Sequence, residues 1–151
     1  FVNMRYKDFD LAVQLNGAFG HKIYNGTSLT FNNLSLYPTY NILDGALDKR
    51  IYDIKISDYY LENGNYVNIE YITLGYNIPV KKLKIEKYLK SLRLAFSVNN
   101  VATITGYSGM TPLINSANVA SKSSVSGTLG VDDKLIYPLS RTYSLSLGVK
   151  F

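Results

Sequence analysis

The sequence has no cysteine and no tryptophan, and its 151 residues include a single histidine, His21. The lack of cysteine excludes a disulfide framework, a thiolate nucleophile and a cysteine-based zinc site, and one histidine is too few for a multi-histidine metal site. We therefore expect no metal, no cofactor and no enzymatic activity. No run approaches the ~20 consecutive apolar residues of a membrane-spanning helix. The strands of a membrane β-barrel are only half apolar, so a membrane location stays open.

The positive charge of the chain is modest and concentrated in one segment. The net charge is +5. Nucleic-acid binding surfaces place basic residues among stacking aromatic side chains or on a recognition helix. Here only Tyr88 lies near the basic cluster, so we expect no nucleic-acid partner. The cluster consists of Lys81, Lys82, Lys84, Lys87, Lys90 and Arg93.

Polar and apolar residues alternate up to the last residue of the sequence. In the stretch 141–151 one face of the predicted strand is apolar and aromatic, and Ser144, Ser146, Gly148 and Lys150 lie on the other. In a soluble sheet this would be an ordinary edge strand, whereas in an outer-membrane barrel the apolar face meets lipid. The stretch resembles the C-terminal strands of outer-membrane barrels, and this resemblance implies a role in barrel closure and assembly for its apolar face. That face consists of Tyr143, Leu145, Leu147, Val149 and Phe151.

The same alternation predicts four further strands. They cover residues 1–6, 9–19, 66–78 and 92–105. The strand over 9–19 is longer than the usual ~5 to 6 residues and matches the ~10 residues that a tilted strand needs to cross a bilayer. The opposite, polar faces provide candidates for residues that face the interior of a barrel. These are Asp10, Gln14, Asn16, Asn77, Arg93 and Asn99.

The connections alternate between short and long. A tight turn lies at Lys7 and Asp8, and residues 80–92 predict a helix of about two turns. Residues 25–65 and 105–138 predict long polar loops without regular structure, rich in Asn, Gly and Ser. Outer-membrane barrels have short periplasmic turns and long extracellular loops. The pattern therefore places both long loops outside and the C-terminus in the periplasm.

Three motifs together resemble the C-terminal part of a SusC/RagA-type TonB-dependent outer-membrane transporter. They are YLENGNYVNIEYITLGYNIP from Tyr60, SLRLAFSVNNVATITGYSGMTP from Ser91 and YPLSRTYSLSLGVKF from Tyr137. The resemblance implies an all-β fold made of the C-terminal antiparallel strands of a 22-stranded transmembrane barrel. Residues 1–151 would be about five of these strands, with the plug and the N-terminal barrel strands absent from this chain.

The resemblance also implies partners and a location. The whole protein would lie in the outer membrane of a Gram-negative bacterium, in contact with lipid. A SusD-like surface lipoprotein would cover it, TonB would energise it through the absent N-terminal part, and an oligosaccharide or an oligopeptide would be imported. Tyrosines of the long loops are candidates for contact with the nutrient or with the lipoprotein. They are Tyr37, Tyr40, Tyr59, Tyr60 and Tyr107.

A second interpretation fits the alternation without a membrane. The chain would then be a self-standing β-rich binding or adhesin-like module that uses its long tyrosine-rich loops as the binding surface. Such a module would be soluble and monodisperse without detergent. We expect aggregation instead, because isolated strands of this kind expose unpaired edges and apolar faces.

Overall fold

The computed structural model describes residues 1–85, 87–114, 130–132 and 139–151. The chain divides into two compact units. The first, here called the sheet unit, comprises Phe1–Gly17, Val67–Ile104 and Leu139–Phe151. The second, the loop unit, comprises Ala18–Tyr66 and Thr105–Pro138. Most of the second predicted loop, at 115–129 and 133–138, lies outside the described residues.

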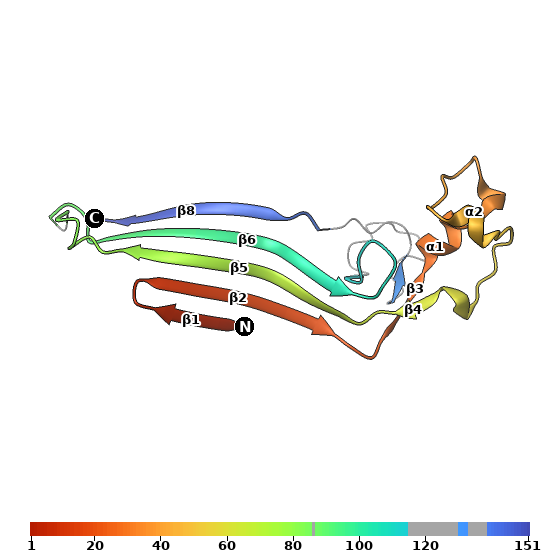
Figure 1. Cartoon of the computed structure of the whole chain (residues 1–151), viewed down its shortest axis with the longest axis horizontal. Helices are drawn as coiled ribbons and strands as arrows, with labels where there is room; N and C mark the ends of the chain where they lie inside the picture. Colours follow the sequence, from red (N-terminus) through yellow and green to blue (C-terminus); the bar gives the residue numbers. More distant parts are fainter. Residues whose placement is uncertain (86, 115–129, 133–138) are drawn as a thin grey trace, which may run out of the picture. The chain divides into compact units, whose positions relative to one another are not determined.

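The sheet unit is built on one open, five-stranded antiparallel sheet. Its strands are β1 (Val2–Tyr6), β2 (Phe9–Ala18), β5 (Tyr66–Ile78), β6 (Ser91–Thr105) and β8 (Thr142–Lys150). They follow one another across the sheet in the order β1-β2-β5-β6-β8, and neighbouring strands run in opposite directions (Figure 1). The prediction of an all-β fold with antiparallel strands is confirmed. The sheet leaves β1 and β8 as open edges, as part of a barrel does.

Strand register separates the two faces of this sheet. Tyr6 lies opposite Phe9, while Arg5 lies opposite Asp10. At the other edge, side chains of like polarity also face each other across β6 and β8. The apolar pairs are Leu92 with Val149, Leu94 with Leu147, Phe96 with Leu145 and Val98 with Tyr143, and the intervening pairs include Ser97 with Ser144 and Asn99 with Thr142. One face is therefore apolar and the other mainly polar, as period-two alternation requires.

The apolar face is exposed in this chain. Leu145 and Leu147 expose 72% and 63% of their surface, and Phe96 exposes 44%. Buried apolar residues are few, and most of them, such as Ile23 and Ala46, belong to the loop unit. Hydrophobic burial between side chains of this chain is thus not the main source of stability for the sheet. An exposed apolar face of this kind is typical of a surface that another molecule covers.

The loop unit contains regular structure that the sequence pattern did not indicate. A small sheet has the order β4-β3-β7 and consists of β3 (Lys22–Asn25), β4 (Leu61–Asn63) and β7 (Val131–Asp132). β3 pairs antiparallel with β4 and parallel with β7. The short helices α1 (Gly26–Phe31), η1 (Leu34–Leu36), α2 (Ala46–Lys49) and η2 (Asp58–Tyr60) lie between β3 and β4 in the chain.

Asparagines explain why residues 25–65 look irregular in the sequence. The side chain of Asn25 accepts a hydrogen bond from the backbone N–H of Ser28 and so caps α1, and Asn33 caps η1 through Ser35. Such side chains satisfy helix-terminal N–H groups, but in a sequence they also signal turns. The prediction of a loop without regular structure is therefore wrong for the described part of this segment.

The helix predicted over 80–92 is not formed. The described residues of this segment form turns, and β6 already begins at Ser91. Lys84 has a φ of 58°, which is incompatible with a continuous right-handed helix. Lysines spaced three or four residues apart would also repel one another along a helix. No helix in the described residues is long and apolar enough to cross a membrane.

Candidate functional site

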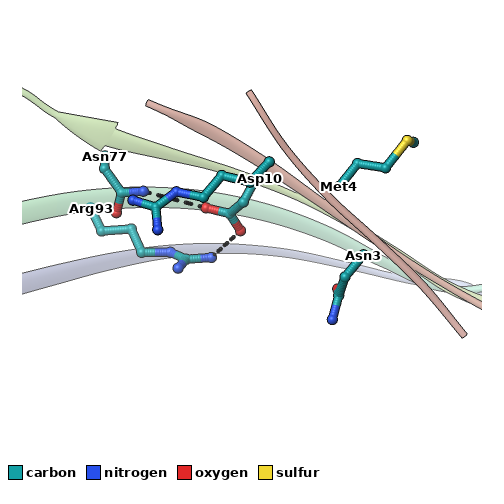
Figure 2. Close-up of a pocket in the computed structure, with 6 residues that line it drawn as sticks. Asn3, Met4, Asp10, Asn77 and Arg93 are labelled. Atoms are coloured by element: carbon teal, nitrogen blue, oxygen red, sulfur yellow. Dashed lines mark hydrogen bonds and ion pairs between the residues drawn. The ribbon is translucent and has the colours of Figure 1, made fainter. Parts of the chain in front are cut away.

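Three strands bring a charged cluster together on the polar face of the sheet unit. Nη2 of Arg93 on β6 lies 2.6 Å from Oδ2 of Asp10 on β2. Nδ2 of Asn77, on the intervening strand β5, donates to Oδ1 of Asp10 over 3.5 Å. Figure 2 shows these three side chains pointing toward one another, whereas Met4 points away from them. The cluster borders a hollow of about 420 Å³ that Asn3 and Arg5 also line.

Gly75 on the central strand makes this cluster possible. A Cβ atom at Gly75 would lie 2.5 Å from Nη2 of Arg93 and 2.6 Å from each carboxylate oxygen of Asp10. Real Cβ atoms do not approach other atoms so closely, so the ion pair crosses β5 in the space that the missing side chain leaves. Glycine within a strand often marks such a close approach. Sequence reasoning did not indicate this role for Gly75.

Gly75→Val is expected to separate Arg93 from Asp10 and to lower the free energy of unfolding by about 1 to 2 kcal/mol, through crowding and loss of a partly exposed ion pair. The measurement is urea unfolding of the full-length protein in lipid vesicles. Gly148→Val is the matched control, because its Cβ would meet nothing closer than 3.8 Å. Equal unfolding midpoints for the two variants would contradict the assigned role of Gly75.

Hydrogen bonds continue along the polar face. The hydroxyls of Thr73 and Ser97 lie 2.9 Å apart. Asn16 donates to Glu70 on the neighbouring strand. Asn99 lies opposite Thr142 in the register of β6 and β8. Of the six predicted interior-facing residues, Asp10, Asn77 and Arg93 thus meet directly, while Gln14, Asn16 and Asn99 lie elsewhere on β2 and β6. That these residues face a barrel interior stays a prediction.

A second polar network lies in the loop unit around Glu62. Nδ2 of Asn25 donates to Oε1 of Glu62 over 2.8 Å, and the hydroxyl of Ser108 donates to the same oxygen over 2.7 Å. The backbone N–H of Ser108 donates to Oε2 over 2.9 Å. Burial opposes ionisation of Glu62, but the hydrogen bonds from Ser108 and Asn25 outweigh it and hold its pKa below the ordinary value. The carboxylate therefore joins β3, β4 and the segment after β6.

Asp132 on β7 anchors the neighbouring part of the same unit. Asp132 is 3% exposed and accepts hydrogen bonds from the hydroxyls of Tyr107, over 2.7 Å, and Thr27, over 2.9 Å. Burial raises the pKa of the Tyr107 hydroxyl well above its ordinary value, and the hydrogen bond and charge of Asp132 raise it further. The two predicted long loops are thus tied to each other by the half-buried carboxylate of Glu62 and the buried carboxylate of Asp132, a connection that the sequence did not reveal.

The loop unit is expected to lose stability at high pH through Tyr107. The pKa of Tyr107 is raised in the folded state above the ordinary value of 10.0, so its contribution is complete below pH 10 and is lost as the pH rises further. Limited proteolysis of the full-length protein between pH 8 and 11 measures this, with cleavage within 18–66 as the signal. Tyr107→Phe should flatten the alkaline rise in cleavage. An unchanged rise in that variant would assign the effect to other groups.

The five tyrosines proposed as loop contacts divide by burial. Tyr37, Tyr40 and Tyr59 expose 62%, 46% and 63% of their surface. Tyr107 is 6% exposed and bonded to Asp132, so it leaves little surface for a ligand, and its role as a contact residue stays a prediction. Tyr60 is 4% exposed, and its ring lies edge-on to Tyr59 with centroids 5.0 Å apart. Only an edge of the Tyr60 ring could therefore contact a ligand.

The residues predicted to close the barrel lie on or just after β8. Tyr143, Leu145, Leu147 and Val149 share the apolar face with their partners on β6, and Phe151 is 79% exposed. Their role in assembly stays a prediction. Among the described residues, no group of three or more His, Cys, Asp or Glu side chains could hold a metal ion. The arrangements above suit hydrogen bonding and charge pairing.

Comparisons with known proteins give one relative in sequence and several in structure. No model of a known protein family matches the chain. TonB-dependent receptor P3 of Formosa agariphila is 28% identical over 158 residues, which cover 99% of this chain and 16% of that receptor. The chain thus spans about a sixth of its relative.

The structural matches include the RagAB peptide transporter, with a TM-score of 0.75 and 17% identity. They also include the RagAB peptide importer in its open-open state, with a TM-score of 0.65 and 16% identity. Each match covers 97% of this chain and 16% of the other. These proteins share the fold of the whole described sheet. The sequence relative is a receptor, and the structural relatives are transporters. The chain is thus similar in sequence to part of a TonB-dependent receptor and similar in fold to part of the RagAB peptide transporter.

Proposed function

We propose that the chain is the C-terminal wall of an outer-membrane transporter that imports oligopeptides. The observation that carries the proposal is the division of one long-stranded sheet into an exposed apolar face and a hydrogen-bonded polar face. Lipid would cover Leu145 and Leu147, and the cluster of Asp10, Asn77 and Arg93 would face the watered interior or the plug. Peptide, rather than oligosaccharide, is favoured because the fold relatives include a peptide transporter.

The proposal includes the sides of the membrane and the partners of the whole protein. The loop unit would lie outside the cell, and the C-terminus would lie in the periplasm, as barrels with short periplasmic turns require. A SusD-like lipoprotein would cover the extracellular loops. TonB would act through a part of the protein that this chain does not contain. Both contacts are testable by co-purification with the full-length protein.

The test is uptake by intact cells of the source bacterium. Deletion of the gene for the whole protein should abolish uptake of fluorescently labelled octapeptides, and deletion of TonB should do the same. Uptake of a labelled oligosaccharide of similar mass serves as the control and should persist. Loss of oligosaccharide uptake with normal peptide uptake would overturn the assignment of peptide as the nutrient while leaving transport itself in place.

The alternative, a soluble binding module, makes the opposite prediction about solubility. It requires residues 1–151 to be monodisperse in buffer without detergent. The exposed apolar face and the open edge strands β1 and β8 favour aggregation instead. A monodisperse, folded chain in gel filtration would favour the binding module over the transporter.

A further inference from the structure

The loop unit contains an open cavity whose lining includes neither Glu62 nor Asp132, the centres of the two polar networks described above. Its volume is about 530 Å³, and residues between Lys49 and Tyr60 line it. The lining includes three cations, Lys49, Arg50 and Lys55, and one carboxylate, Asp53, and so has a net charge of plus two. Such a charge on the wall of a hollow raises the local concentration of anions.

The carboxylate neutralises only part of this charge. Asp53 pairs with Lys55 over 3.3 Å, and both side chains are largely exposed, so water screens the pair and it is weak. Arg50 forms no ion pair within the described part of the chain. Its guanidinium therefore remains available for a carboxylate, which it can hold through two parallel hydrogen bonds.

Aromatic rings form the remaining walls. Tyr52 and Tyr59 are 62% and 63% exposed, and Tyr60 lies beneath Tyr59 with its ring edge-on. Tyrosine offers a flat apolar surface with a polar tip and few rotatable bonds, which suits contact with a peptide. Ile51 adds an aliphatic side chain to the same lining.

Backbone contacts hold the lining in place. Arg50 ends α2 in the left-handed conformation, with a φ of 49°. The next residue, Ile51, forms an isolated β-bridge to Asn33, and its carbonyl accepts a hydrogen bond from the N–H of Leu34 over 2.8 Å. At the other end of the lining segment, the N–H of Tyr60 in η2 donates to the carbonyl of Ser57, the residue before this helix. The two ends of the lining segment, at Ile51 and at Tyr60, are thus anchored within the loop unit.

We propose that this cavity binds a carboxylate of an acidic oligopeptide. Arg50 and Lys55 would contact the carboxylate, and Tyr59 would pack against the neighbouring side chain of the peptide. The proposal rests on the proposed import of peptides and adds to it a preference for acidic sequences and a place where they are recognised. Binding at such a site should weaken as salt concentration rises, because charge supplies the selectivity.

The experiment measures peptide binding to the full-length transporter purified in detergent, by fluorescence anisotropy. One labelled octapeptide contains three Glu residues, and a second has Gln at the same positions. Arg50→Gln should weaken binding of the acidic peptide about tenfold, as expected for loss of one charged contact, and leave the Gln peptide within about twofold. Lys55→Gln is a second variant in case Arg50→Gln does not fold. Lys82→Gln, in an exposed turn of the sheet unit, is the control that removes one cation elsewhere.

The outcomes separate this inference from the proposed function. Unchanged binding of the acidic peptide in both cavity variants, or equal weakening of both peptides, would overturn the carboxylate site. If the wild type binds both octapeptides equally well, peptide import survives and the acidic preference fails. If the wild type binds neither peptide but binds an acidic oligosaccharide, the assignment of peptide fails and the site proposal fails with it.

Discussion

Leu147→Arg is expected to lower the stability of the full-length barrel by about 2 to 4 kcal/mol when it is refolded into lipid bilayers. Leu147 lies within β8 opposite Leu94, on the apolar face, and is 63% exposed in this chain. A guanidinium at that place would have to leave water for hydrocarbon. Urea titration of the fluorescence of an attached label, with the protein in vesicles, gives the free energy of unfolding.

Ser144→Arg is the matched control for Leu147→Arg. Ser144 lies on the same strand but on the other face, opposite Ser97. Water or polar groups would surround the new arginine there, so the cost should stay below about 1 kcal/mol. Equal losses for the two variants, or wild-type stability for Leu147→Arg, would contradict a lipid-facing apolar surface.

Asp132→Ala is expected to destabilise the loop unit by about 3 kcal/mol, because it leaves buried hydroxyls without their charged acceptor. Tyr107 and Thr27 both donate to this carboxylate, and Tyr107 is almost fully buried. Hydrogen exchange of the full-length protein should show loss of protection in β3 and β7, with protection of β5 and β6 unchanged.

Tyr107→Phe tests the hydrogen bond from Tyr107 separately from the loss of the Asp132 carboxylate. This variant removes one donor and keeps the bond from Thr27 to Asp132, so its cost should be smaller, about 1 kcal/mol. Loss of protection as large as in Asp132→Ala would mean that the aromatic hydroxyl carries the whole effect. Unchanged protection in Asp132→Ala would mean that the buried network does not hold the loop unit together.

The sheet could be predicted from the sequence because each of its strands has a stretch with a local period-two pattern. Leu145 and Leu147 show the apolar face without any knowledge of their partners. The loop unit could not be predicted, because its strands are short and its stability depends on contacts between distant segments. Glu62 meets Ser108, and Thr27 meets Asp132, only after folding.

The candidate site was predicted only in part for the same reason. Alternation placed Asp10 and Arg93 on one face, but their contact depends on register across three strands and on the absence of a side chain at Gly75. Tyr107 looked like a surface tyrosine because burial by distant residues has no local signature. The basic segment at 80–92 suggested a helix because the spacing of its apolar residues, over so short a segment, fits a helix as well as a turn.

The central claim is that one face of β8 meets lipid and the other meets water. Single cysteines at positions 144–149 of the full-length protein in vesicles, each carrying a nitroxide label, test it through collision with oxygen and with a water-soluble nickel complex. The account predicts alternation: labels at Leu145, Leu147 and Val149 favour oxygen, and labels at Ser144, Ser146 and Gly148 favour nickel. Equal access to nickel at all six positions would contradict the account.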